Sequence, residues 1–146
     1  MYVRELMPHS GDMVLIDSIV ERRNDFISTK TIINKDNPFL ENNLFPAFNT
    51  LEIMAQSLVV FRGLSDKSSS FRLGFLLGAR KFEIYKPYLK IKDELITKTI
   101  ISEDFNGMGV YESSVFVNDE LVASANISLF NPSKEQLDEI LKASNE

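Results

Sequence analysis

Residues 51–63, LEIMAQSLVVFRG, decide the fold of this chain, because they predict a helix that is apolar on nearly every side. The first residues are strong helix formers, and Gly63 is a residue type that commonly ends a helix. A helix with apolar residues all round is normally buried. The stretch therefore predicts one long buried helix, whose apolar residues are Leu51, Ile53, Met54, Ala55, Leu58, Val59, Val60 and Phe61.

Strand-like segments lie on both sides of this helix. They are rich in β-branched and aliphatic residues; two precede the helix, and four follow it with no helix between them. Four consecutive strands indicate an antiparallel sheet, and therefore an α+β domain rather than an α/β one. We expect a sheet that curls around the buried helix. The segments are residues 13–21, 25–33, 73–86, 94–103, 110–117 and 121–130.

The connections between these segments carry turn signals. Asn24 and Asp25 separate the first two strands, and residues 118–120 separate the last two as a hairpin turn. Residues 34–49 contain two prolines and five asparagines, which predicts an irregular loop. Residues 133–136 fit a helix capping box and precede apolar residues at helical spacing, so we expect a short surface helix at the end of the chain.

The composition limits the size and the chemistry of the protein. Its 146 residues fit a single domain covering residues 1–146, since domains commonly run to about 100–200 residues. Sixteen basic and 21 acidic residues give a net charge of -5, which argues against a nucleic-acid binder. With no Cys and one His, disulfides, zinc fingers, iron–sulfur clusters and a cysteine nucleophile are excluded. We expect no cofactor, and any imidazole chemistry must use His9.

The sequence also bears on location. Residues 1–5 carry no apolar stretch that could act as a signal peptide, and no apolar run approaches the ~18 residues of a membrane span. We therefore expect a soluble, cytoplasmic protein.

Polar residues on the apolar helix are the first candidates for chemistry. Glu52 and Gln56 are four residues apart, so they share one helix face. A carboxylate on a buried helix carries a desolvation cost unless it is paired or protonated, and such a group suits proton transfer. The commoner explanation is structural, because Asn49 and Glu52 have the spacing of a capping box. Glu52 can cap the helix and also face a cleft. Gln56 either orients the carboxylate, binds a ligand or bonds within the core.

Three further features have both a structural and a functional interpretation. His9 lies in a Pro/Ser/Gly turn before the first strand, where a surface or strand-entry role is usual. Free N–H groups at the start of the helix could polarise a carbonyl oxygen or hold an anion. A basic run in this acidic chain either forms a solvated face or docks an acidic partner; it comprises Arg80, Lys81, Lys86, Lys90 and Lys92.

Three segments together resemble the hot-dog-fold 3-hydroxyacyl-acyl-carrier-protein dehydratases. Residues 6–21, LMPHSGDMVLIDSIVE, look like the family's Leu-Pro-His-Arg stretch and its following Leu-Leu-Val-Asp strand. Residues 52–56, EIMAQ, resemble the Glu-Ala-Met-Ala-Gln motif that opens the central helix. Residues 79–95, ARKFEIYKPYLKIKDEL, look like the segment in which an Ala-Arg-Phe strand leads to a Pro-Gly-Asp turn.

A divergent branch of that family is the closer match. Its members are the predicted dehydratases of aryl-polyene and similar acyl-chain gene clusters. Their equivalent strand resembles residues 74–80, GFLLGAR, and their helix follows a shortened stretch like Pro46-Ala47-Phe48. The resemblance implies a hot-dog domain that dimerises, as a homo- or heterodimer, with clefts at the dimer interface. It also implies a 3-hydroxyacyl thioester substrate on an acyl carrier protein, whose acidic surface suits the basic run.

The resemblance also assigns site residues. Glu52 matches the family's catalytic carboxylate, and the candidate substrate-binding residues are Phe48, Asn49 and Gln56. The family's catalytic His stands in a Gly-His-Phe-Pro motif, whereas residues 42–46 read NNLFP here. The imidazole role is therefore filled by His9 or is absent. The leading hypothesis is a dehydratase, followed by a non-catalytic subunit that binds acyl chains or supports an active partner, and then by a thioesterase.

Overall fold

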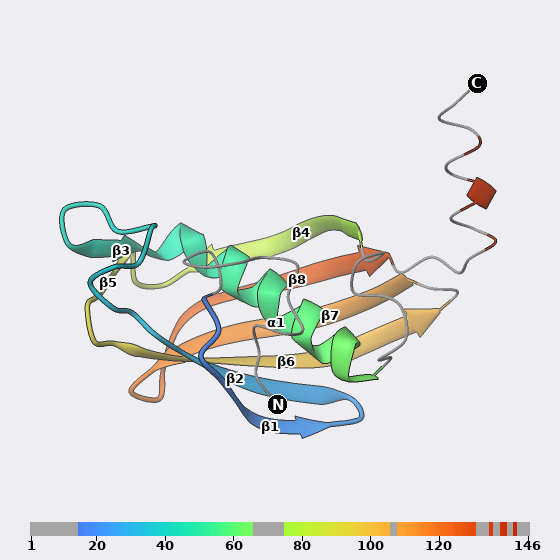
Figure 1. Ribbon diagram of the computed structural model, residues 1–146, viewed down its shortest axis with the longest axis horizontal. Helices are drawn as coiled ribbons and strands as arrows, with labels where there is room; N and C mark the ends of the chain where they lie inside the picture. The colour runs from blue at the N-terminus through green and yellow to red at the C-terminus, as the bar shows by residue number, and fades with distance from the viewer. Residues whose placement is uncertain are drawn as a thin grey trace.

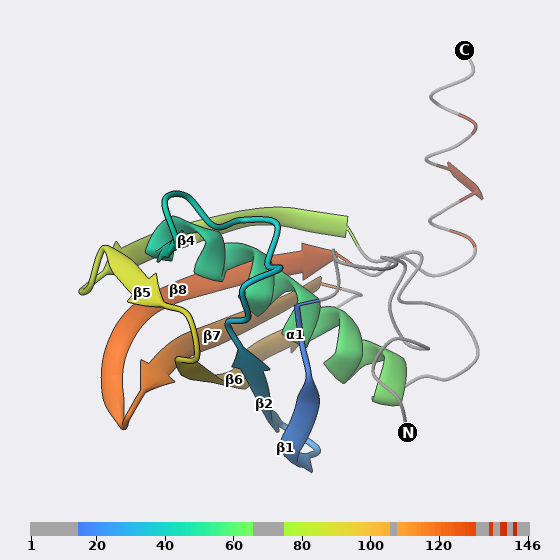
Figure 2. The same cartoon turned by 60° about the vertical axis from the view of Figure 1, so that its left-hand side comes forward.

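The computed structural model describes residues 15–65, 75–105 and 108–130, and four further positions near the C-terminus. Within these residues, a six-stranded antiparallel sheet curves around one long helix, α1 (Figures 1 and 2). The strand order across the sheet is β1-β2-β6-β7-β8-β4. The predicted α+β architecture, with a sheet wrapped around one helix, is confirmed.

Most elements begin and end within two residues of the predicted segments, but β1 begins at Ser18, so residues 15–17 of the predicted strand 13–21 lie before it. The helix α1 covers Thr50–Ser65, two residues past Gly63. The large sheet consists of β1 (Ser18–Arg23), β2 (Phe26–Ile32), β4 (Phe75–Ile84), β6 (Glu94–Phe105), β7 (Met108–Val117) and β8 (Glu120–Phe130).

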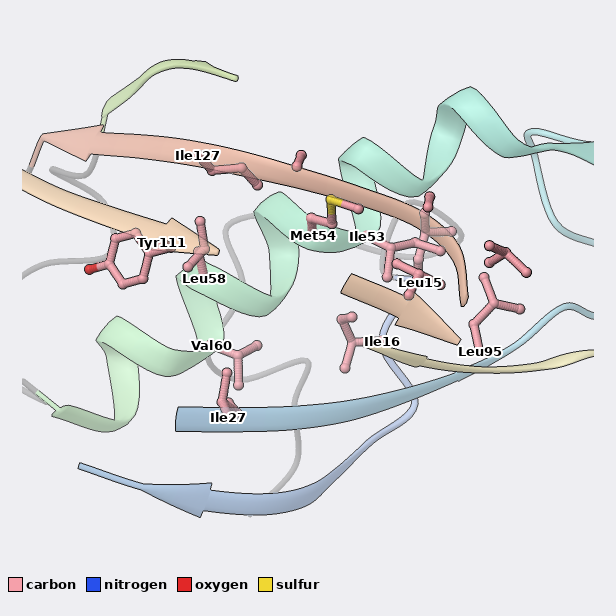
Figure 3. Close-up of a cluster of buried hydrophobic side chains, with 14 of the residues drawn as sticks. Leu15, Ile16, Ile27, Ile53, Met54, Leu58, Val60, Leu95, Tyr111 and Ile127 are labelled. Atoms are coloured by element: carbon pink, nitrogen blue, oxygen red, sulfur yellow. The ribbon is translucent and has the colours of Figure 1, made fainter. Parts of the chain in front are cut away.

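The core lies between α1 and the concave face of the sheet. Along β7, residues 111, 113, 115 and 117 are buried, while the residues between them are half-buried or exposed. This alternation places one face of the strand against the helix, since side chains alternate across a strand. Ile53, Met54 and Leu58 of α1 are almost fully buried and belong to the same apolar cluster as Ile27 and Ile127 (Figure 3).

The hairpin between β7 and β8 confirms the predicted turn. Asn118 and Asp119 have φ angles of 51° and 62°. Two consecutive residues with positive φ match the backbone twist of a two-residue hairpin, and Asn and Asp tolerate this conformation better than most residues. The turn places Val117 opposite Glu120.

The prediction for residues 34–49 is only partly right. The end of that stretch forms a short strand, β3 (Leu44–Pro46), which pairs with β5 (Tyr88–Lys90) in a separate two-stranded sheet. A 3-10 helix, Ala47–Asn49, then leads directly into α1. A three-residue strand is too short to show a periodic pattern, and its partner lies more than forty residues away in the sequence.

Two predictions concern the ends of the chain. The proposed C-terminal helix lies largely outside the described residues, although Glu135, Asp138, Glu139 and Lys142 are helical and exposed. None of the helices in the described part of the chain combines the length and the apolar character needed to cross a membrane.

Candidate active site

The start of the central helix differs from the predicted capping box. Pro46 is extended, with φ -61° and ψ 128°, and the helical conformation begins at Ala47. The N–H of Ala47 donates to the carbonyl of Pro87 at 2.8 Å, and the Thr50 hydroxyl donates to the carbonyl of Ala47 at 2.7 Å. Asn49 therefore lies inside a continuous helical run and is not its N-cap. The capping-box interpretation of Asn49 and Glu52 is wrong, because the 3-10 turn moves the helix boundary back to Pro46.

Glu52 instead interacts with the next turn of its own helix. Its side chain is half-buried, and its Oε1 accepts a hydrogen bond of 3.0 Å from Nε2 of Gln56. Gln56 is completely buried, and its Oε1 accepts a hydrogen bond of 2.8 Å from the backbone N–H of Leu15. Both ends of the amide are thus engaged, which fixes which end faces Glu52. Of the three roles considered for Gln56, the structure supports orientation of the carboxylate and a hydrogen bond within the core.

This arrangement defines what Glu52 can do chemically. Glu52 lies in the first turn of α1, after the three-residue 3-10 turn, so its carboxylate is near the positive end of the helix dipole, which interacts favourably with negative charge. The hydrogen bond from Gln56 holds one carboxylate oxygen in place, and a positioned carboxylate can accept or donate a proton.

The remaining candidate residues lie on the turn that precedes Glu52. Phe48 is an exposed aromatic residue, with 57% of its surface accessible, and Asn49 is half-buried. Both lie within one helical turn of Glu52. His9, the other candidate catalytic residue, lies outside the described residues.

One part of the basic run lies close to the same helix start. Arg80, Lys81, Lys90 and Lys92 are exposed, and Lys86 is half-buried. The connection from β4 to β5 that carries Lys86 is tied to the start of the helix by the bond from Ala47 to Pro87. The connection that carries Lys86 is therefore held against the start of the helix that carries Glu52.

One contributor to the site was not predictable from the sequence. Leu15 acts through its backbone N–H, which holds the buried amide of Gln56, 41 residues further along the chain. A backbone contact between distant segments leaves no residue pattern, so no motif could have indicated it.

Comparisons with known proteins agree with the fold and identify the family. The family model described as ApeP-like, ApeP dehydratase, matches residues 1–142. The chain is 25% identical over 136 residues to the 3-hydroxyacyl-(acyl-carrier-protein) dehydratase FabZ of Campylobacter lari, covering 87% of this chain and 92% of the relative. It is 26% identical to the same enzyme of Shewanella loihica, covering 86% of each chain.

Solved structures show the same architecture. The dehydratase heterocomplex ApeI:P of Xenorhabdus doucetiae superposes with a TM-score of 0.85 at 21% identity, over 97% of both chains. A hypothetical thioesterase of Streptococcus pneumoniae, solved with coenzyme A, gives a TM-score of 0.64 at 16% identity, over 80% of this chain and 85% of that one. These likenesses confirm the predicted hot-dog fold. Because the family model spans nearly the whole sequence, the predicted dehydratase class is confirmed as well, and the chain belongs to the ApeP-like dehydratase family.

Proposed function

We propose that this chain is a subunit of a 3-hydroxyacyl-acyl-carrier-protein dehydratase and that Glu52 transfers a proton in its reaction. The observation that carries the proposal is the half-buried carboxylate of Glu52, held by Gln56 in the first turn of α1. The matching relatives of Campylobacter and Shewanella bear the name of this activity, which supports the choice of substrate class.

The reaction requires two proton transfers. A base removes a proton from the α-carbon, the bond between the β-carbon and its hydroxyl oxygen breaks, and an acid protonates that oxygen as it leaves as water. The electron pair of the broken C–H bond forms the double bond of the trans-2-enoyl thioester. Hydrogen-bond donors must also stabilise the negative charge that develops on the thioester oxygen. The free N–H groups at the start of the helix are our candidates for these donors.

His9 is our candidate for the second proton-transfer group. It is the single His of the chain, and it lies six residues before Leu15, whose N–H bonds to Gln56. An extended segment of six residues spans at most about 20 Å, so this anchor keeps His9 within that distance of Leu15. In the cleft of a dimer, the imidazole can come from the same chain or from the facing subunit.

We also infer that a second hot-dog subunit faces this chain. The Xenorhabdus structure is a heterocomplex, which supports a pairing of two different hot-dog chains here. In this chain, β4 occupies one edge of the sheet, where backbone groups remain available for pairing with a second sheet. A chain with a positioned carboxylate and one His is suited to share a site with such a partner.

The third component of the proposed reaction is the acyl carrier protein that bears the substrate. Lys81, Lys90 and Lys92 are exposed on or beside the strands that approach the start of α1. An acidic carrier protein would be attracted to this positive surface and would present its thioester next to Glu52.

The proposal is tested by identifying the product. The purified chain, alone and together with a co-expressed hot-dog partner, is given a 3-hydroxyacyl thioester on its carrier protein, and mass spectrometry follows the acyl group. Loss of one water to give an enoyl thioester supports the proposal. Release of a free acid would instead establish a thioesterase, and tight binding of the carrier substrate without either product would establish a non-catalytic acyl-binding subunit.

A further inference from the structure

The other end of the central helix borders a polar cavity. Its volume is about 480 Å³, within the range of about 300–1,000 Å³ that is usual for small-molecule sites. Arg62 of α1 and Tyr111 of β7 line it, together with Arg22 of β1. Arg62 lies ten residues after Glu52, and a rise of about 1.5 Å per residue separates them by about 15 Å along the helix. The cavity is therefore not part of the Glu52 site.

Two hydrogen-bond donors meet in this cavity. Nη1 of Arg62 lies 3.4 Å from the hydroxyl oxygen of Tyr111, which accepts this long hydrogen bond. Because the phenol oxygen acts as the acceptor, the O–H of Tyr111 is available to donate to another group. Tyr111 is 1% exposed, and in Figure 3 its hydroxyl points away from the cluster of apolar side chains. Burial raises the pKa of this phenol, so it remains a neutral donor at physiological pH.

The charge of the lining favours an anion. Two ion pairs between described residues, Arg23 with Glu21 and Lys30 with Glu94, do not involve Arg62. Asp104 is the single carboxylate among the described lining residues, against two guanidinium groups. The lining residues therefore carry more positive than negative charge, whereas the whole chain has a net charge of -5.

The remaining lining residues are Asn24, which is polar, and two apolar residues, Phe61 and Ile101. Phe61 is 3% exposed, and its ring packs edge-to-face on Tyr111 with the ring centroids 6.4 Å apart. Ile101 is half-buried on the same side of the sheet and pairs with Tyr111 in the ladder between β6 and β7. The cavity thus offers apolar surface beside its polar donors.

We propose that this cavity binds a small organic carboxylate, with its oxygens on the guanidinium of Arg62 and the hydroxyl of Tyr111, and its apolar body against Phe61 and Ile101. A guanidinium presents paired N–H groups that match the two oxygens of a carboxylate, and such charge-assisted bonds are the stronger ones in proteins. The proposal does not depend on dehydratase activity.

The test is a titration of the full chain with hexanoate, followed by NMR of the tyrosine rings. The chain has four Tyr residues, and the ring signal of Tyr111 is assigned as the one missing in Tyr111→Phe. We expect saturable movement of this signal with a Kd in the millimolar range. Hexanamide, which has the same apolar body without the charge, should bind at least about tenfold more weakly, as expected for loss of a charge-assisted contact.

Variants locate the contact. Arg62→Gln should weaken hexanoate binding by about tenfold or more. The affinity of Arg62→Lys should be intermediate, because lysine keeps the positive charge but lacks the paired N–H groups of the guanidinium. Arg23→Gln is the matched control: Arg23 lies on the same strand as Arg22, pairs with Glu21 and is not among the described lining residues. Its hexanoate affinity should equal that of the parent chain, and circular dichroism verifies that each variant is folded.

Three outcomes would overturn the proposal. The first is hexanoate binding that is equal in the parent chain and in folded Arg62→Gln. The second is equal binding of hexanoate and hexanamide, which would remove the role of the charge. The third is a shift of the Tyr111 signal with inorganic phosphate but not with hexanoate, which would assign the cavity to a phosphate group without an apolar body.

Discussion

Nε2 of Gln56 lies 3.0 Å from Oε1 of Glu52, while the other end of the same amide is held by the N–H of Leu15. The amide thus joins the segment that enters β1 to the carboxylate of the proposed active site. Because Gln56 is fully buried, its replacement has two separate effects, one on the stability of the fold and one on the position of Glu52.

Gln56 is therefore a positioning residue whose role can be separated from simple stability. Gln56→Leu has a similar size but leaves the N–H of Leu15 and the carboxylate of Glu52 without their amide partner. We expect a loss of about 1–3 kcal/mol in the free energy of unfolding, measured by urea denaturation. We also expect kcat to fall about tenfold while KM changes little, because Gln56 is fully buried and acts through Glu52. A change confined to stability, with kcat intact in the folded variant, would contradict the positioning role.

Glu52→Gln removes the proton-transfer group and keeps the shape of the side chain. General acid–base groups contribute about 10²–10⁴-fold to rate, so enoyl formation should fall by at least about 10². The assay is formation of the enoyl thioester on the carrier protein. Glu112→Gln is the matched control, because Glu112 is exposed on the opposite face of β7, and its rate should equal that of the parent. A Glu52→Gln variant that retains activity within a few-fold would exclude Glu52 from proton transfer.

His9→Ala separates the possible sources of the imidazole. If the His9 of this chain is the second proton-transfer group, the rate should fall by at least about 10² in every assembly that contains the variant. If a partner subunit supplies the imidazole, His9→Ala should retain activity within a few-fold, and the loss should follow mutation of a His in the partner. Measuring both variants in the co-purified complex distinguishes the two outcomes, and only the first keeps His9 in the mechanism.

The fold was predictable because its main signals are local. Residues 51–63 are apolar all round, and this stretch alone locates the helix that the structure gives as Thr50–Ser65. The strands of the large sheet are six or more residues long and most show β-branched or alternating patterns, so they could be identified without knowledge of their partners. The short pair β3 and β5 could not, because each is three residues long and exists through contact with the other.

The site was predictable only in part, for a related reason. Glu52 and Gln56 stand out as polar residues on one face of an apolar helix, and their hydrogen bond follows from spacing of four residues. The anchor at Leu15 and the cavity between Arg62 and Tyr111 join segments that are 41 and 49 residues apart. Such contacts depend on the register of the folded sheet, which a single sequence does not reveal.

Tyr111 provides a prediction for the pH dependence of stability. Burial raises the pKa of its phenol above the ordinary value of 10.0; the Coulombic effect of Asp104 acts in the same direction, and the guanidinium of Arg62 opposes it. The folded chain therefore holds this proton more tightly than the unfolded chain does. Its contribution to stability is complete below pH 10 and is lost as the pH rises through the folded-state pKa.

Other groups also titrate in this range, so the informative quantity is the difference between the parent chain and Tyr111→Phe. Phenylalanine keeps the ring that packs on Phe61 but has no proton to lose. Urea unfolding at a series of pH values from about 8 to 11 should show a constant difference in the free energy of unfolding below pH 10. Above pH 10, the parent should lose stability faster than the variant. A difference that stays constant or increases over the same range would show that the phenol does not titrate as a buried group.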